Sequence, residues 1–169
     1  MARLWFLLLG ILSLTAHFNT LQAEECSIRK LFNGEDEKFC SKGLDIIYSD
    51  IGLVSCIYIP NCFDFSWSLS KVWEHPLVRY SKAQPGWQLI SGQDLTGIDI
   101  SAYHRPSPPP GTGYHRYQFY LYEQPIGIQP YLLPEESRRS TWDFEAFVAR
   151  TKLGKPLATT QFMAMSHIQ

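Results

Sequence analysis

The run GYHRYQFYLYEQ places an imidazole and a phenol at alternate positions near the start of an aromatic stretch. Side chains alternate between the two faces of a β-strand, so His115 and Tyr117 should be neighbours on one face. Both groups can donate hydrogen bonds to the oxygens of an anion such as phosphate. Apolar residues continue this face and predict an apolar floor below a polar mouth, which is typical of a small-ligand pocket. By this alternation one face carries His115, Tyr117, Phe119 and Leu121, and the other carries Arg116, Gln118, Tyr120 and Tyr122.

The preceding segment, SPPPGTG, has the composition of a stiff wall that ends in a turn. Its three consecutive prolines fix φ and favour an extended stretch without internal hydrogen bonds. Gly111 and Gly113 allow the chain to turn where a side chain would clash. A rigid wall beside exposed backbone N–H groups can hold an anion such as phosphate.

A structural interpretation competes with the anion site. A histidine beside a tyrosine in a strand is more often a packed residue with satisfied hydrogen bonds than a ligand contact. The prolines are also consistent with a plain surface loop. Their Pro106-x-x-Pro109 spacing resembles an SH3 ligand, but an exported chain would not meet intracellular SH3 domains. Arg116, on the opposite face from His115, is expected to form an ion pair or to pack.

The sequence offers little for catalysis, metal binding or nucleic-acid binding. It contains no Gly-x-Ser-x-Gly or His-Glu-x-x-His motif, and His75, His104 and His167 lack metal-ligand spacing. The chain has 15 Lys and Arg against 16 Asp and Glu, a formal net charge of -1, so it has no long-range basic field. We therefore expect a protein that is not an enzyme, with no cofactor, no metal site and no nucleic-acid partner.

The elements that would position these residues are mostly short strands. Strand patterns are expected at residues 44–48, 57–59, 87–90, 114–122 and 158–165, whereas residues 63–80 are aromatic and are expected to be irregular. One helix is expected, capped by Ser140 or Thr141 and ended by Gly154 and Pro156, with Phe144, Phe147 and Val148 on one face. The fold class predicted is a mainly β domain with a peripheral helix.

The first 23 residues, MARLWFLLLGILSLTAHFNTLQA, have the pattern of a secretory signal peptide. Their apolar run is about half the ~20 residues that a membrane-spanning helix needs, which disfavours the alternative of a signal anchor. Residues 24–169 are then expected to form one secreted, extracellular domain without a transmembrane segment.

Residues 24–62 hold all the cysteines, Cys26, Cys40, Cys56 and Cys62. An even number in an exported chain predicts two disulfides, and the absence of a Cys-x-x-Cys pair disfavours zinc. Of the three connectivities, a hairpin centred near residues 49–53 would place Cys40 opposite Cys62 and leave Cys26 for Cys56.

The stretch AYHRPSPPPGTGYHRYQFYLYEQ resembles the second signature of the phosphatidylethanolamine-binding protein family. The resemblance is close from Ile100 onward and loose before Ser91. It implies a large central antiparallel sheet, a smaller sheet, a few peripheral helices and a small pocket for a phospholipid head group or another phosphate-type anion. In that pocket, the resemblance makes His115 and Tyr117 ligand contacts and places Ser107 and Pro109 on the wall.

The chain also departs from the family pattern. Family members carry an earlier Asp-Pro-Asp-x-Pro strand end and a Trp-x-His-type segment, and His75 and Asp94 match neither motif. The departure predicts that an internal segment with a core strand is missing and that the pocket is weakened. Arg105, where many members have a small residue, would either crowd the wall or supply a charge.

Two other functions compete with lipid binding. One is a protein-interaction module, such as a protease inhibitor or a signalling modulator, with a protein partner. The other is a structural variant without a working pocket.

Overall fold

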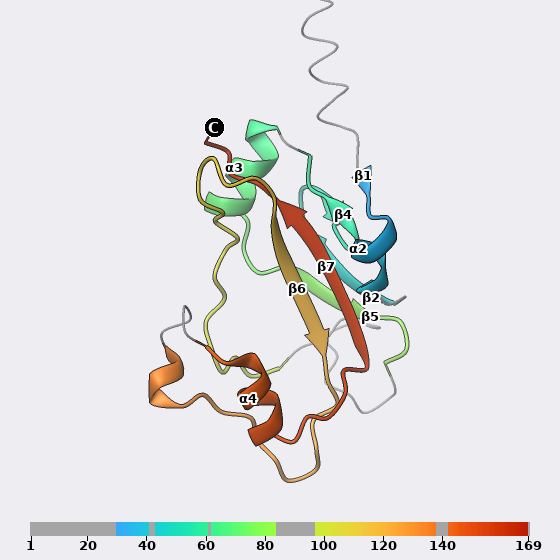
Figure 1. The fold of residues 1–169 in the computed structure, drawn as a ribbon, viewed down its shortest axis with the longest axis vertical. Coiled ribbons are helices and arrows are strands. Elements are labelled where there is room, and N and C mark those ends of the chain that lie inside the picture. Colours follow the sequence, from blue (N-terminus) through green and yellow to red (C-terminus); the bar gives the residue numbers. More distant parts are fainter. Residues whose placement is uncertain (1–29, 41–42, 61, 84–96, 138–141, 169) are drawn as a thin grey trace, which may run out of the picture.

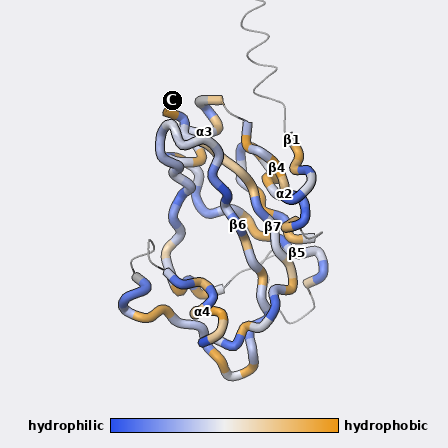
Figure 2. Tube along the Cα trace, viewed as in Figure 1, coloured by the Kyte–Doolittle hydropathy of each residue, from blue (hydrophilic) through white to orange (hydrophobic). Residues whose placement is uncertain are grey.

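The computed structural model describes residues 30–40, 43–60, 62–83, 97–137 and 142–168 (Figure 1). The predicted signal peptide, Cys26 and the expected strand at 87–90 lie outside this part of the chain. Along the described residues, hydrophobic and hydrophilic stretches alternate over short distances (Figure 2). No helix among them has the length and apolar character needed to cross a membrane.

Two sheets form the framework, which confirms the mainly β fold class. The four-stranded sheet has the order β1-β4-β7-β6, in which β4 and β7 run parallel and the other neighbours are antiparallel. The three-stranded sheet has the order β3-β2-β5 and is antiparallel throughout. The strands are β1 (Lys30–Leu31), β2 (Leu44–Tyr48), β3 (Gly52–Leu53), β4 (Ile57–Tyr58), β5 (Leu77–Tyr80), β6 (His115–Leu121) and β7 (Ala158–Ala164).

The described helices are short and lie around the sheets (Figure 1). The expectation of an irregular stretch at residues 63–80 was wrong, since it contains α3 and β5. The cap expected at Ser140 or Thr141 was also wrong: Asp143 is the N-cap of α4, and its carboxylate accepts a hydrogen bond from the backbone N–H of Ala146. The helices are α2 (Gly34–Lys38), α3 (Phe63–Lys71), α4 (Phe144–Arg150) and a 3-10 turn, η1 (Pro134–Ser137).

The main core lies between the two sheets and α3. Phe162 of β7 is fully buried, and Tyr117 and Phe119 of β6 pack against the same cluster. Along β6, half-buried residues alternate with exposed ones, which confirms the predicted faces of this strand. The buried members of this core are Ile46, Tyr48, Ile51, Val54, Ile57, Ile59, Leu69, Trp73, Phe162 and Ala164.

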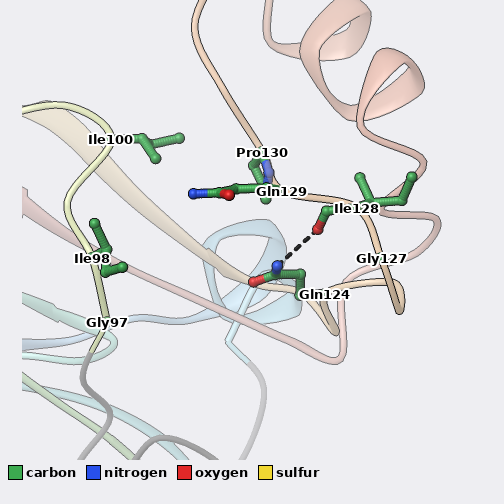
Figure 3. Close-up of a pocket in the computed structure, with 8 residues that line it drawn as sticks. All are labelled: Gly97, Ile98, Ile100, Gln124, Gly127, Ile128, Gln129 and Pro130. Atoms are coloured by element: carbon green, nitrogen blue, oxygen red, sulfur yellow. Dashed lines mark hydrogen bonds between the residues drawn. The ribbon is translucent and has the colours of Figure 1, made fainter.

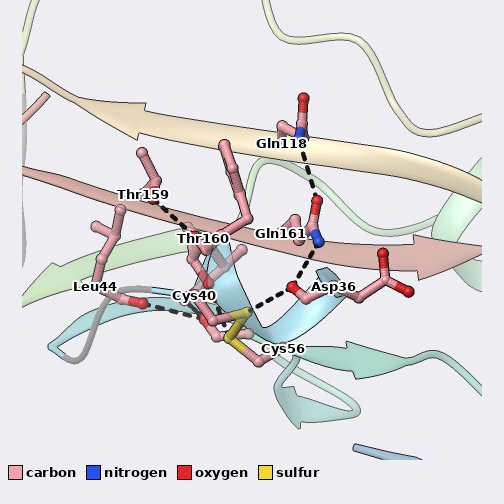
Figure 4. Close-up of a disulfide and its surroundings, with 11 residues drawn as sticks. Asp36, Cys40, Leu44, Cys56, Gln118, Thr159, Thr160 and Gln161 are labelled. Atoms are coloured by element: carbon pink, nitrogen blue, oxygen red, sulfur yellow. Dashed lines mark hydrogen bonds between the residues drawn. A yellow bond between two sulfur atoms is a disulfide. The ribbon is translucent and has the colours of Figure 1, made fainter. Parts of the chain in front are cut away.

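The disulfide pairing differs from the expected one. Cys40 is bonded to Cys56, with their Cα atoms 6.0 Å apart (Figure 4), so the expected Cys40–Cys62 pair was wrong. The reason is that β2 turns back only into the short β3, after which the chain leaves for the other sheet as β4. Cys56, in the left-handed conformation (φ 64), begins this departure next to the end of α2. Cys62 is also disulfide-bonded, and no described cysteine is free.

Candidate functional site

Strand β6 presents the predicted imidazole and phenol on its core-facing side. In the ladder between β6 and β7, His115 is opposite Ala164 and Tyr117 is opposite Phe162. The Tyr117 ring stacks on the Phe162 ring, with a centroid distance of 5.2 Å. Phe119 and Leu121 continue this face and pack against buried clusters, and Phe162 of β7 lies against the Tyr117 ring.

The turn before β6 holds the imidazole from one side. The Thr112 hydroxyl lies 2.8 Å from the Pro109 carbonyl oxygen and 2.6 Å from His115 Nε2. Because the single hydroxyl proton is donated to the carbonyl, Nε2–H donates to the Thr112 oxygen. This arrangement orients the ring and leaves Nδ1 without a hydrogen-bond partner among the described residues. Gly111 and Gly113 adopt φ values of 70 and 73, which side chains rarely accept, and so allow the turn.

The two predicted wall residues are placed differently. Pro109 reaches the imidazole indirectly, because its carbonyl accepts from the same Thr112 hydroxyl that contacts His115. Ser107 is exposed, and its hydroxyl donates to the Arg105 carbonyl oxygen at 3.3 Å. The neighbouring Pro106 and Pro108 are buried, so the segment is packed through alternate residues.

A cluster of phenols lies below this turn, and the sequence patterns did not reveal it. The hydroxyl oxygens of Tyr48 and Tyr103 are 2.8 Å apart. Burial, together with the nearby Tyr103, raises the pKa of Tyr117 to about 12. Burial and the Tyr103 hydrogen bond also raise the pKa of Tyr48 above its ordinary value. Burial raises the pKa of Tyr103 as well. The three phenols are therefore protonated at neutral pH, and one hydroxyl of the Tyr48–Tyr103 pair donates to the other.

The raised pKa of Tyr117 predicts a loss of stability in alkali. The phenol ionises at about pH 10 in the unfolded chain and at about 12 in the folded protein. Its contribution to stability is therefore complete below about pH 10 and declines as the pH rises through about 12. Urea denaturation between pH 8 and pH 11 should show a smaller decline for Tyr117→Phe than for the wild type. The exposed Tyr131→Phe variant should behave as the wild type, and equal declines in all three proteins would contradict the prediction.

Arg105 anchors the wall to α3. Its Nε donates to the Trp73 carbonyl oxygen at 2.7 Å, and its Nη2 donates to the Val72 carbonyl oxygen at 3.3 Å. These carbonyls follow the C-terminus of α3, where a cation is favourable. These hydrogen bonds hold the segment before the turn against the end of α3, and the two alternatives from the sequence, a crowded wall or a charge for the anion, stay predictions.

The described residues also line two cavities of about 620 Å³ each. One is lined by Tyr48, Asp50, Trp73 and His75 among other residues, and the His75 ring lies 6.5 Å from the Tyr103 ring. The other is lined by Gly97, Ile98, Ile100, Gln124, Gly127, Ile128, Gln129 and Pro130 (Figure 3). Neither lining includes His115 or Tyr117, although the first cavity shares Tyr48 with the phenol cluster.

The described residues show no other arrangement suited to chemistry. Among them, no group of three His, Cys, Asp or Glu side chains is placed to hold a metal ion. On the outer face of β6, Arg116 forms an ion pair with Asp36 of α2, as one of the sequence alternatives proposed. The candidate site therefore consists of the turn around Thr112, the imidazole of His115 and the phenols beneath it.

Comparison with known proteins identifies the region that contains this site. The family model described as Phosphatidylethanolamine-binding protein matches residues 77–163, which is half of the chain. The match runs from β5 to β7 and includes the proline segment, the turn and β6. No solved structure matches the chain.

Proposed function

Because the chain belongs to the phosphatidylethanolamine-binding protein family, we propose that it is a secreted, non-enzymatic module that binds phosphate-type anions, including phospholipid head groups. The observation that carries the proposal is the His115 imidazole, which Thr112 fixes through Nε2 and whose Nδ1 has no partner among the residues that the structure describes. A protonated imidazole in this position can donate from Nδ1 to a phosphate oxygen. The Tyr117 phenol on the same face is the second donor.

We propose that this binding is weak. The pocket carboxylate and the second histidine that the family resemblance implies have no counterpart in the sequence, and a missing internal segment would explain both absences. The chain otherwise resembles the secreted member of the family. Each charge-assisted contact contributes roughly 1.5–3 kcal/mol. The loss of two such contacts would weaken the affinity for phosphate by about two to four powers of ten. Transcript and genomic sequence around the codons for residues 80–92 would show whether a segment has been skipped.

Calorimetric titration with phosphorylethanolamine, inorganic phosphate and ethanolamine tests the proposal. Both phosphate compounds should bind, with dissociation constants on the order of 1 mM, and ethanolamine should not. His115→Ala should remove the heat of binding. His104→Ala is the matched control, because His104 is an exposed histidine of the same segment.

The other outcomes separate the alternatives. Micromolar binding that His115→Ala abolishes would show a complete pocket and contradict the proposed weakness. If His115→Ala leaves binding unchanged, the anion binds at another site. If no phosphate compound binds, the protein-interaction module or the variant without a pocket becomes the better account.

Thr112 should act as a positioning residue for the imidazole. Replacing it by valine removes the hydroxyl that contacts both Pro109 and His115. The loss should weaken phosphate binding by about tenfold, since one net hydrogen bond contributes about 1 kcal/mol and orientation is lost with it. Thr112→Ser keeps the hydroxyl and should restore most of the affinity. A valine variant with unchanged affinity would show that the turn does not position the imidazole.

A further inference from the structure

Strand β6 is the last strand of the four-stranded sheet in the part of the chain that the structure describes. β7 lies along one side of it, and no described strand lies along the other (Figure 1). The segment around residues 97–113 passes on that open side, but no described backbone hydrogen bond joins it to β6.

The ladder shows which backbone groups of β6 point outward. The backbone carbonyls of Gln161 and Met163 in β7 accept hydrogen bonds from the backbone N–H groups of Cys56 and Ile59. The backbone polar groups of Gln161 and Met163 therefore point toward β4. Backbone N–H and C=O groups alternate in direction along a strand, so those of Thr160 and Phe162 point toward β6. Their partners in β6 are Phe119 and Tyr117. The N–H and C=O groups of the intervening residues, Arg116, Gln118 and Tyr120, must therefore point away from β7.

We propose that this edge is a dimerisation surface that pairs antiparallel with the same edge of a second copy, about a two-fold axis at Gln118. In that register, Gln118 is opposite its own copy and Arg116 is opposite Tyr120 of the second copy. All outward N–H and C=O groups of these residues then form hydrogen bonds, six across the two copies by the antiparallel pattern. The two four-stranded sheets would join into one continuous sheet, and the interface would be isologous.

The side chains of β6 fit this pairing. On the outer face, Arg116 would stay paired with Asp36 and would be opposite Tyr120 of the second copy, so no like charges are opposed. On the inner face, Tyr117 would be opposite Phe119 of the second copy. A register centred on Arg116 would instead oppose like charges and form fewer hydrogen bonds.

The edge also lacks the features that usually prevent such pairing. In natural proteins, edge strands that remain exposed to solvent tend to carry lysines, prolines or β-bulges. The sequence of β6, HRYQFYL, contains neither lysine nor proline, and its register against β7 is uninterrupted. Its one arginine, Arg116, is already paired with Asp36 of the same chain.

Sedimentation velocity and amide hydrogen exchange on the full secreted protein test the proposal together. At concentrations on the order of 100 µM a monomer–dimer equilibrium should appear. The amides of Arg116, Gln118 and Tyr120 should gain protection with rising concentration. The amides of Tyr117 and Phe119, already bonded to β7, should not change.

Two variants at Gln118 add a second test. Gln118→Pro removes an N–H that points away from β7, so the ladder between β6 and β7 should survive. It removes two of the six intermolecular hydrogen bonds and should raise the dissociation constant by about tenfold to a hundredfold. Gln118→Lys places like charges opposite each other and should also weaken the dimer. Gln129→Lys, at an exposed position away from β6, is the matched control.

Three results would overturn the proposal. A protein that remains monomeric over the whole concentration range would do so. So would a dimer whose protected amides lie outside β6, or a dimer that Gln118→Lys leaves as stable as Gln129→Lys does. Because hydrogen exchange uses the wild-type chain, the test does not depend on whether the proline variant folds.

Discussion

Replacing Phe162 with alanine is expected to lower the free energy of unfolding by about 3–5 kcal/mol. The Phe162 side chain is fully buried, and its ring lies against those of Tyr48, Tyr117 and Phe119, at centroid distances of 6.1, 5.2 and 5.8 Å. Truncation would leave a cavity between the sheets that rigid aromatic neighbours cannot fill. A loss of this size is a large part of the roughly 5–15 kcal/mol that stabilises a domain.

Urea denaturation followed by tryptophan fluorescence measures this loss. Ile126→Ala is the control, because Ile126 is fully exposed and its truncation should change stability by less than about 0.5 kcal/mol. Phe162→Leu should cost less than Phe162→Ala, since it refills part of the space. A cost below about 1 kcal/mol for the alanine variant would contradict the packing of β6 on β7.

Removing the Cys40–Cys56 disulfide in the double alanine variant is expected to cost about 3 kcal/mol. The bond closes a loop with a sequence separation of 16 and ties the end of α2 to the start of β4. Opening it enlarges the unfolded ensemble, and the chain-entropy relation gives the quoted magnitude for a loop of this length. Denaturation without reductant, compared between the wild type and the double variant, measures the loss.

The pairing itself can be read by peptide mapping. Chymotrypsin cleaves after Tyr58 and so separates Cys56 from Cys62. The unreduced digest should contain a peptide that joins Cys40 to Cys56, and the denatured, unreduced protein should show no free thiol. A peptide that joins Cys40 to Cys62 would contradict the structure.

The sequence predicted the strands whose pattern is strongest. The seven residues of β6 alternate regularly, so the faces that hold His115 and Tyr117 followed directly from the period of a strand. β7 was recognisable from its β-branched and apolar residues. Their pairing joins residues far apart in the sequence, so the period predicted the faces of β6 but not its register against β7.

Other features depend on tertiary contacts that no local pattern reveals. The sequence of α3, FDFSWSLSK, is rich in aromatic residues and serines, which have only modest helix propensity, and its packing in the core favours the helix. The disulfide prediction failed because it assumed that β2 and β4 form one hairpin. The hydrogen bond between Tyr48 and Tyr103 joins residues far apart in the sequence, so spacing could not predict it.

Thr112 was closer to being predictable. It lies between two glycines in a turn, where a threonine hydroxyl commonly bonds to a nearby backbone carbonyl. That local rule would have placed its oxygen near Pro109. Only the structure shows that the same oxygen also contacts the imidazole.

The most direct test of the anion site is an NMR titration of the labelled protein with inorganic phosphate, observing backbone amides and the imidazole nitrogens. Shifts should concentrate at Thr112, His115 and Tyr117, and the Nδ1 resonance of His115 should move more than its Nε2 resonance. Shifts that cluster around the cavity of Asp50 and His75, or an Nδ1 resonance that stays unchanged while phosphate binds, would contradict this prediction.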